Sequence, residues 1–228
     1  MNELVSAALA YVKQGWAITP LHWIEPDGSC SCGNPWRDPE HDHKQGGKHP
    51  LMREWQNKPI STLDEVTKAW ERWPRANIGG LTGVRSRLWV LDMDPDNGAQ
   101  LSDIPAVKEA GRVHQTGSGG YHFVYRTTDE FEPTNARGDL PPGWDVRGTG
   151  GQVVLPPSVT GKGAYRVVKA SSLTKAPRSI EEMILRKKSA EDDVPLRSNA
   201  RDSYRGRHRR ESTHVYRTRD GRRTWGTC

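Results

Sequence analysis

Apolar positions near the amino terminus recur at spacings that predict two helices with a strand between them. Positions 4, 5, 8, 9, 11 and 12 follow a helical spacing, with Asn2 suited to the N-cap and Gly15 to the helix end. Residues 16–20 are typical of a short strand. Thr62 and Glu65 form a capping-box pattern, which predicts the start of the second helix.

Farther along, short apolar runs alternate with Gly- and Pro-rich turns, which predicts mostly strands. The expected strands cover residues 88–94, 121–126, 152–155 and 165–168. Residues 77–83 predict a strand or a tight turn, in which glycines let another backbone approach. One or two helical turns are expected at 105–110 and a short helix at 179–188.

The strand predicted at 88–94 carries the first candidate chemistry, because it ends in two carboxylates one residue apart. Alternation along a strand places Asp92 and Asp94 on the same face. Such carboxylates repel each other unless a cation lies between them, and Mg²⁺ prefers oxygen ligands of this kind. The alternative is a strand that runs into a polar turn, since Pro-Asp-Asn-Gly at 95–98 is a strong turn sequence.

Composition bears mainly on the compartment. The chain has 228 residues, of which 33% are hydrophobic, and nine Trp allow a real core. No apolar stretch is long enough to cross a bilayer, and the amino terminus lacks a signal peptide's apolar core. Three Cys is an odd count, which argues against a secreted disulfide framework. We therefore expect a cytosolic protein that does not engage a membrane.

Positive charge is concentrated at the carboxyl terminus. From Pro195 onward there are ten Arg and three acidic residues, a balance of +7 against +6 for the whole chain, which leaves −1 for residues 1–194. Residues 189–228 lack a periodic apolar pattern, so they are predicted to be a disordered tail after a domain over 1–188. This tail is either a non-specific tether to nucleic-acid phosphates or a solvated extension.

A glycine-rich turn before the strand at 121–126 adds candidate phosphate ligands. In Ser118-Gly119-Gly120-Tyr121-His122, the glycines leave backbone N–H groups free to meet an anion. His122 is a candidate donor to a phosphate, although a histidine at a strand start is more often structural.

The segment at 144–151 offers a third carboxylate beside an arginine. Asp145 and Arg147 share a face if this segment is a strand, and the alternative is a plain surface ion pair. Glycines at 77–83 either lie under a base or ribose or serve packing. Three carboxylates, a His and an Arg at strand ends suit two-metal phosphoryl transfer, in which metal ions hold a nucleotide's phosphates and activate a hydroxyl.

Residues 22–50 have little periodicity and contain a set of potential zinc ligands. Cys30 and Cys32 are followed by His41, His43 and His49. Four ligands of Cys₂His₂ type make a structural Zn²⁺ site, although the Cys-x-Cys spacing is tighter than the common Cys-x-x-Cys. The predicted ligands are Cys30, Cys32, His43 and His49, with His41 as a substitute, and the alternative is an unliganded polar loop.

A series of short motifs follows a definite order along the chain. They are Gly15-Trp16…Pro20, Gly47-Lys48-His49-Pro50, Trp70, Asn77-Ile78-Gly79, Thr82-Gly83, Leu91-Asp92-Met93-Asp94, Ser118-Gly119-Gly120-Tyr121-His122, Asp145-Val146-Arg147-Gly148 and Pro156-Pro157-Ser158. Each is loose, but together they closely resemble the bifunctional DNA primase/polymerase amino-terminal domain over roughly residues 5–170. This is the prim-pol branch of the archaeo-eukaryotic primase superfamily, frequent in phages and plasmids.

The resemblance implies an α+β fold, with an RRM-like mixed sheet as its core beside an amino-terminal α/β unit. It implies primer synthesis and extension from NTPs or dNTPs on a single-stranded DNA template, with two Mg²⁺ or Mn²⁺ ions. Asp92 and Asp94 match the family's first metal motif, and Asp145 matches the metal carboxylate of the third. His122 matches the histidine that touches the incoming nucleotide's phosphates. Arg147 lies in a matched segment, and we infer a phosphate contact for it.

In the Cys/His-rich insert, the chain departs from the family pattern. Related domains often carry a third Cys where His43 stands here.

The nucleotide-binding set expected from the motifs is Ser118, Gly119, Gly120, His122 and Arg147.

Two other classes of function compete with a primase-polymerase. One is a single-stranded-DNA-binding module that kept the fold without catalysis, and the other is a different Asp-x-Asp enzyme such as a nuclease or glycosyltransferase. The intact carboxylates favour catalysis, since an inactive domain has no physical reason to keep repelling Asp side chains. No Gly-x-x-x-x-Gly-Lys-[Ser/Thr] loop follows the domain, so we expect a separate helicase chain, in the cytoplasm of a bacterial host.

Overall fold

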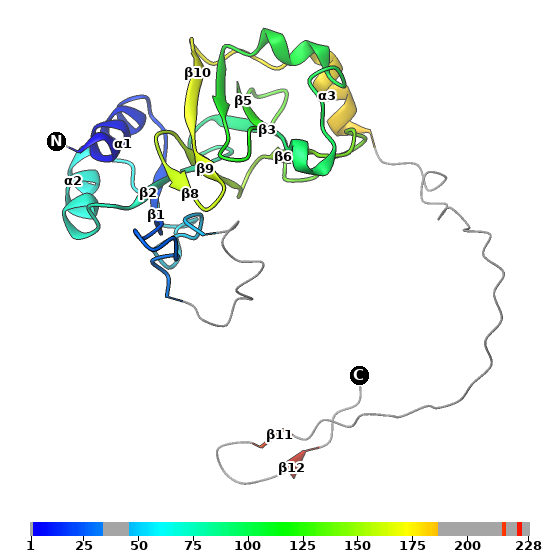
Figure 1. Cartoon of the computed structure of the whole chain (residues 1–228). Helices are drawn as coiled ribbons and strands as arrows, with labels where there is room; N and C mark the ends of the chain where they lie inside the picture. Colours follow the sequence, from blue (N-terminus) through cyan, green and yellow to red (C-terminus); the bar gives the residue numbers. More distant parts are fainter. Residues whose placement is uncertain (1, 34–45, 187–215, 218–222, 225–228) are drawn as a thin grey trace, which may run out of the picture. The chain divides into compact units, whose positions relative to one another are not determined.

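The computed structural model describes residues 2–33, 46–186, 216–217 and 223–224 (Figure 1). Contacts divide the chain into two compact units, Met1–Ser189 and Ala190–Cys228. In the second unit, β11 (Tyr216–Arg217) pairs antiparallel with β12 (Arg223–Thr224). The predicted disorder of the tail otherwise falls on residues outside those described, so it stays a prediction. All other helices and strands belong to the first unit.

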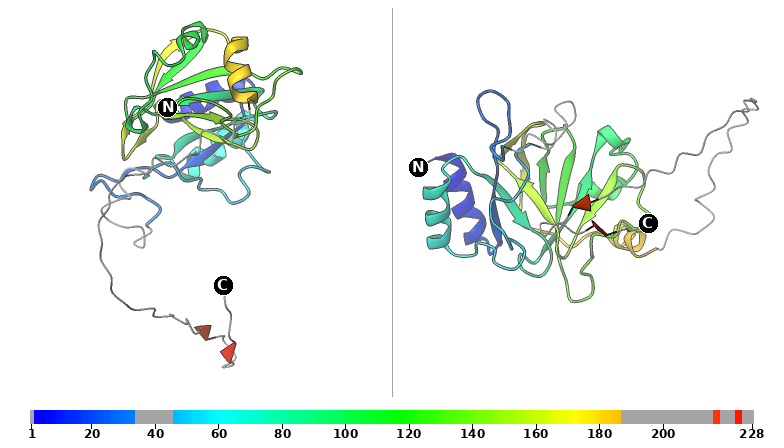
Figure 2. Two further views of the ribbon diagram at one scale, coloured as in Figure 1. Left: turned by 90° about the vertical axis from the view of Figure 1, so that its right-hand side faces the viewer. Right: turned by 90° about the horizontal axis from the view of Figure 1, so that it is seen from below.

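Two helices and a three-stranded sheet form the amino-terminal part of the first unit. Helix α1 (Glu3–Lys13) and helix α2 (Leu63–Arg72) lie side by side beside this sheet (Figures 1 and 2). The strand order is β1-β2-β7, with both pairings antiparallel. The strands are β1 (Ile18–Leu21), β2 (Asn77–Leu81) and β7 (Gln152–Leu155).

Both helices begin at the N-cap residues that the sequence predicted. The Asn2 side chain accepts a hydrogen bond from the backbone N–H of Leu4 at 2.8 Å. Thr62 and Glu65 form both hydrogen bonds of the capping box. The predicted helix starts are therefore confirmed. No helix among the described residues is long and apolar enough to cross a membrane.

The second sheet has five strands in the order β10-β4-β5-β3-β6. The strands are β3 (Leu88–Met93), β4 (Arg112–Gln115), β5 (Tyr121–Arg126), β6 (Trp144–Arg147) and β10 (Arg166–Ala170). Among β3 to β6, the first and third strands along the chain are central, as in an RRM. The α+β, RRM-like prediction is confirmed. The sequence predicted a mixed sheet, whereas every strand pairing here is antiparallel.

Short elements connect and cover the five-stranded sheet. They are the 3₁₀ segments η1 (Pro95–Asn97) and η2 (Pro105–Glu109), the hairpin strands β8 (Val159–Thr160) and β9 (Gly163–Ala164), and helix α3 (Arg178–Leu185). Successive side chains of β3 point into two different hydrophobic clusters, one on each face of the sheet. Leu91 packs with residues of η2 and α3 on one face, and Val90 packs with residues of α1 and α2 on the other. The sheet is therefore buried on both faces along most of β3.

Strand β4, like the short hairpin strands β8 and β9, was not predicted from the sequence. Its sequence is Arg-Val-His-Gln, with one apolar residue in four, so it lacks the alternation on which strand prediction rests. It forms because β5 and β10 pair with it on both sides. Tertiary pairing thus overrides local preference here.

Candidate active site and metal centre

Carboxylate and imidazole side chains form one row across the five-stranded sheet. Asp92 of β3 lies directly opposite His122 of β5 on one side and Asp145 of β6 on the other. His114 of β4 lies opposite His122 and extends the row to a fourth strand. Directly opposite residues of antiparallel strands project from the same face. The register therefore brings together side chains that are far apart in the sequence.

Asp92 is at the centre of the row and faces both a histidine and an arginine. Its Oδ1 lies 3.5 Å from Nε2 of His122, and its Oδ2 lies 3.5 Å from Nη2 of Arg147. The same Nη2 lies 3.7 Å from Oδ2 of Asp145, so one guanidinium faces both carboxylates. The side chain of His122 is 6% exposed and that of Asp145 is 53% exposed. The row is thus mostly covered at His122 and more open to a ligand at β6.

Asp94 lies in the turn that follows β3. Its Oδ1 accepts a hydrogen bond from the Asp96 backbone N–H at 3.1 Å, and its Oδ2 accepts one from the Asn97 side chain at 2.9 Å. The carboxylate therefore caps η1, as the polar-turn interpretation expected. Each of its oxygens keeps a second lone pair. Asp94 and Asp92 both interact electrostatically with Lys48 and Tyr165, so the two carboxylates border the same space.

The His122 side chain is almost entirely buried, which affects its protonation. Burial lowers the pKa of His122; Asp92 opposes this effect, while Arg147 and Lys48 add to it. The imidazole is therefore neutral at pH 7. Its Nδ1 has no hydrogen-bond partner within the part of the chain that the structure describes. A neutral imidazole still carries one N–H donor, so His122 can donate to a ligand without being a cation.

The turn between β4 and β5 places Ser118, Gly119 and Gly120 next to the end of β3. A Cβ at Gly120 would lie 2.1 Å from the carbonyl oxygen of Met93, so the two backbones are in close contact there. Gly119 has a φ of 85°, in the left-handed region that favours glycine. The glycines are thus needed for the turn itself, and the turn borders the carboxylates at the end of β3.

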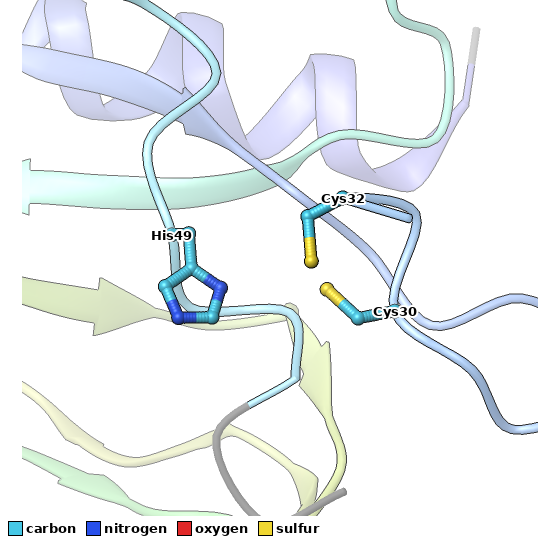
Figure 3. Close-up of side chains that lie close together, drawn as sticks. All are labelled: Cys30, Cys32 and His49. Atoms are coloured by element: carbon cyan, nitrogen blue, oxygen red, sulfur yellow. The ribbon is translucent and has the colours of Figure 1, made fainter. Parts of the chain in front are cut away.

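A second cluster of potential ligands lies in the segment of the chain that connects β1 to α2. The ligand atoms of Cys30, Cys32 and His49 all lie within 4.8 Å of one another. Figure 3 shows the two sulfur atoms pointing toward each other beside the His49 ring. Thiolate and imidazole are the donors that Zn²⁺ prefers, so these residues fit three positions of a tetrahedral site. The predicted fourth ligand, His43, and its substitute, His41, lie outside the described residues.

The family model of the bifunctional DNA primase/polymerase, N-terminal (Prim-Pol) matches residues 8–179. The chain belongs to this family. The matched range covers the whole row and both sheets. Comparison with curated proteins finds no match. The resemblance seen in the order of motifs is thus confirmed, and the prim-pol domain belongs to a group of primases and polymerases, which act on DNA and nucleotides.

Besides His114, two residues that sequence reasoning did not place there, Lys48 and Tyr165, border the row. Lys48 interacts electrostatically with Asp92 and Asp94. Burial lowers the pKa of Lys48, and the nearby charge of Lys162 lowers it further. The ring of Tyr165 lies 5.8 Å from that of His122, centroid to centroid. The only available signal was for Lys48, which stands in the Gly-Lys-His-Pro motif.

The glycine-rich strand β2 serves packing, one of the two interpretations left open by the sequence. A Cβ at Gly80 would lie 2.7 Å from the Leu155 side chain, and one at Gly79 would lie 2.8 Å from Leu21. The Asn77 carboxamide donates to the Gly47 carbonyl at 3.0 Å and accepts from the backbone N–H of Val159 at 3.0 Å. Asn77 thus ties the end of the insert to the sheet.

Proposed function

We propose that this prim-pol domain catalyses template-directed nucleotidyl transfer, making or extending primers. The observation that carries the proposal is the Asp92–Asp145 pair, with His122 and Arg147 in contact distance, in one row across the sheet. Incorporation of labelled nucleotides on a single-stranded template is the experiment that tests it.

The carboxylates of the row suit divalent metal ions. Asp92 and Asp145 occupy directly opposite positions on one face, and a single guanidinium lies 3.5 and 3.7 Å from their oxygens. Each carboxylate oxygen has two lone pairs, so these contacts leave acceptor positions on Asp92 and Asp145 for another cation, and Asp94 borders the same space. Bound Mg²⁺ or Mn²⁺ would activate a 3′-hydroxyl and stabilise charge on the phosphates. The residues expected to hold the ions are Asp92, Asp94 and Asp145.

The remaining residues of the row would bind the nucleotide. Arg147 is 41% exposed, so its guanidinium can reach an anion while it orients Asp92 and Asp145. His122 would donate one hydrogen bond from a fixed position, because its ring is enclosed. The turn at Ser118, Gly119 and Gly120 borders the carboxylates. The Gly119 N–H already donates to the Thr116 carbonyl at 3.0 Å, so the N–H groups of Ser118 and Gly120 would be the donors for phosphate oxygens.

Removal of the His122 imidazole should impair chemistry more than template binding. Loss of one preorganised donor typically lowers the rate on the order of 10²–10³-fold, so we expect a decrease of this size in His122→Ala. Single-turnover incorporation rates and single-strand binding, measured on the same preparations, check this. A variant that lost template affinity and kept the incorporation rate would reassign His122 to the template.

We also propose a structural zinc ion at the Cys30–Cys32–His49 cluster. Protein purified without a histidine tag should contain about one Zn²⁺ per chain, the stoichiometry of a closed four-ligand site. His43→Ala should lower the zinc content, whereas His41→Ala should not, because His43 is the preferred fourth ligand. Zinc-free wild-type protein, prepared without chelators, would contradict the proposal, and the opposite result for the two histidines would exchange their roles.

The alternatives differ from this proposal in what they do with a nucleoside triphosphate. A DNA-binding module would bind a single strand and incorporate nothing, and a nuclease would shorten the strand without a triphosphate. The Asp92–Asp145 pair favours catalysis, since an arrangement of repelling carboxylates gains nothing from binding DNA alone. The proposed partners are a single-stranded DNA template, NTPs or dNTPs and a separate helicase, in phage or plasmid replication within a bacterial cytoplasm.

A further inference from the structure

Lys48 brings a cation to the row from outside both sheets. It lies in the segment that returns from the Cys/His insert, between Gly47 and His49. Its charge interacts with Asp92, Asp94 and Arg147, and the charge of Lys48 in turn acts on His122. Backbone contacts place the same segment beside the site: the Gly46 carbonyl accepts from the Gly161 backbone N–H at 3.0 Å, and the next residue, Lys162, pairs with Asp96, two residues after Asp94.

Lys48 forms no direct ion pair with a described residue, unlike Lys162, the other lysine of this region. Lys162 Nζ lies 3.0 Å from Oδ2 of Asp96, so its charge is already paired. The ammonium group of Lys48 makes no hydrogen bond or ion pair with the residues described here, although the side chain is partly buried. A partly buried ammonium without a partner is unfavourable unless an anion joins it. The site thus has an available cation beside the proposed phosphate ligands.

The backbone around Lys48 is fixed by the cysteine–histidine cluster and by the sheet. The backbone N–H of Gly47 donates to Cys30 Sγ at 3.4 Å, and the Gly47 carbonyl accepts from Asn77. On the other side, the His49 carbonyl accepts from the backbone N–H of His22 at 2.8 Å. His49 itself belongs to the cluster. Lys48 therefore lies between two residues whose positions depend on the cluster.

We propose that Lys48 binds the triphosphate of the incoming nucleotide and that the Cys30–Cys32–His49 cluster holds it in position. This inference rests on the proposed function, because it assumes a nucleotide at the row. A metal ion at the cluster would draw Cys30, Cys32 and His49 together and so fix the backbone on both sides of Lys48. The cluster then contributes to nucleotide affinity although it does not touch the nucleotide.

The affinity of each variant for a nucleoside triphosphate tests this inference directly. Titration calorimetry with a 2′,3′-dideoxynucleoside triphosphate and Mg²⁺ measures binding without turnover. A charge-assisted contact is worth about 10–100-fold in affinity, so Lys48→Ala should bind the triphosphate weaker by this factor. Lys48→Ala should keep its zinc, and Lys48→Arg should restore part of the affinity. The matched control is Lys68→Ala, an exposed lysine of α2 paired with Asp64, which should bind as the wild type does.

A double-mutant cycle tests the role of the cluster. Cys32→Ser should lose zinc and weaken triphosphate binding in the wild-type background. In the Lys48→Ala background, Cys32→Ser should weaken triphosphate binding little further, because two substitutions that remove the same contact do not have additive effects on affinity. Circular dichroism of each variant confirms that the comparison is between folded proteins.

Each remaining outcome has a definite meaning. Equal triphosphate affinity of Lys48→Ala and the wild type would overturn the inference and leave the proposed function standing. Fully additive losses would overturn the coupling between the cluster and Lys48. A wild-type protein that binds no nucleoside triphosphate would overturn the inference and the proposed function together.

Discussion

Asp92→Asn is expected to abolish nucleotide incorporation while the protein stays folded. The substitution keeps the shape of the side chain and removes the charge that faces His122 and Arg147. A catalytic metal ion contributes several kcal/mol to transition-state stabilisation, so loss of a ligand should lower the rate by about 10³-fold or more. The thermal midpoint should not fall, because the repulsion between Asp92 and Asp145 is relieved.

The control for this result is an aspartate outside the row. Asp64 of α2 is exposed and pairs with Lys68, so Asp64→Asn should retain wild-type activity. Quenched-flow incorporation with saturating nucleotide and both Mg²⁺ and Mn²⁺ provides the rates. A folded Asp92→Asn protein with the wild-type rate would remove Asp92 from the metal centre.

Leu91→Ala is expected to give the largest loss of stability among substitutions beside the site. Leu91 precedes Asp92 but lies on the opposite face of β3, where it is fully buried among residues such as Trp144 and Ile180. Truncation of a buried leucine costs about 2–5 kcal/mol of unfolding free energy. Urea unfolding followed by tryptophan fluorescence measures the change.

An exposed leucine provides the matched comparison. Leu185 at the end of α3 is 70% exposed, so Leu185→Ala should change the unfolding free energy by less than about 0.5 kcal/mol. Equal losses in Leu91→Ala and Leu185→Ala would show that the described core under β3 does not form. The neighbours Leu91 and Asp92 should thus separate stability from catalysis.

The strongest local patterns were sufficient to predict much of this fold. The capping box at Thr62 and Glu65 satisfies backbone N–H groups that no distant residue influences, so it could be read directly from the sequence. The apolar run before Asp92 predicted a buried strand because both faces of β3 are covered. Helix α3 was predicted as well, although it ends at Leu185, earlier than expected.

The site itself depends on strand register, which the sequence does not reveal. That Asp92 lies between His122 and Asp145 follows from how three strands pair. The motif order suggested that these residues meet, but their distances needed the sheet. His114 was missed because β4 has no apolar alternation, and burial lowers the pKa of this histidine to about 3. Lys48 was missed because it lies in an insert without periodicity.

Nucleotide incorporation on a template of one base tests template-directed synthesis most directly. An oligo-dT strand is incubated with Mg²⁺ or Mn²⁺ and labelled ATP or dATP, with and without an annealed primer, and labelled CTP or dCTP serves as the mismatched control. We expect longer labelled products with the adenine nucleotides alone, and none with Asp92→Asn. Template binding without any product would contradict it in favour of a binding module, and shortening of the strand without nucleotide would indicate a nuclease.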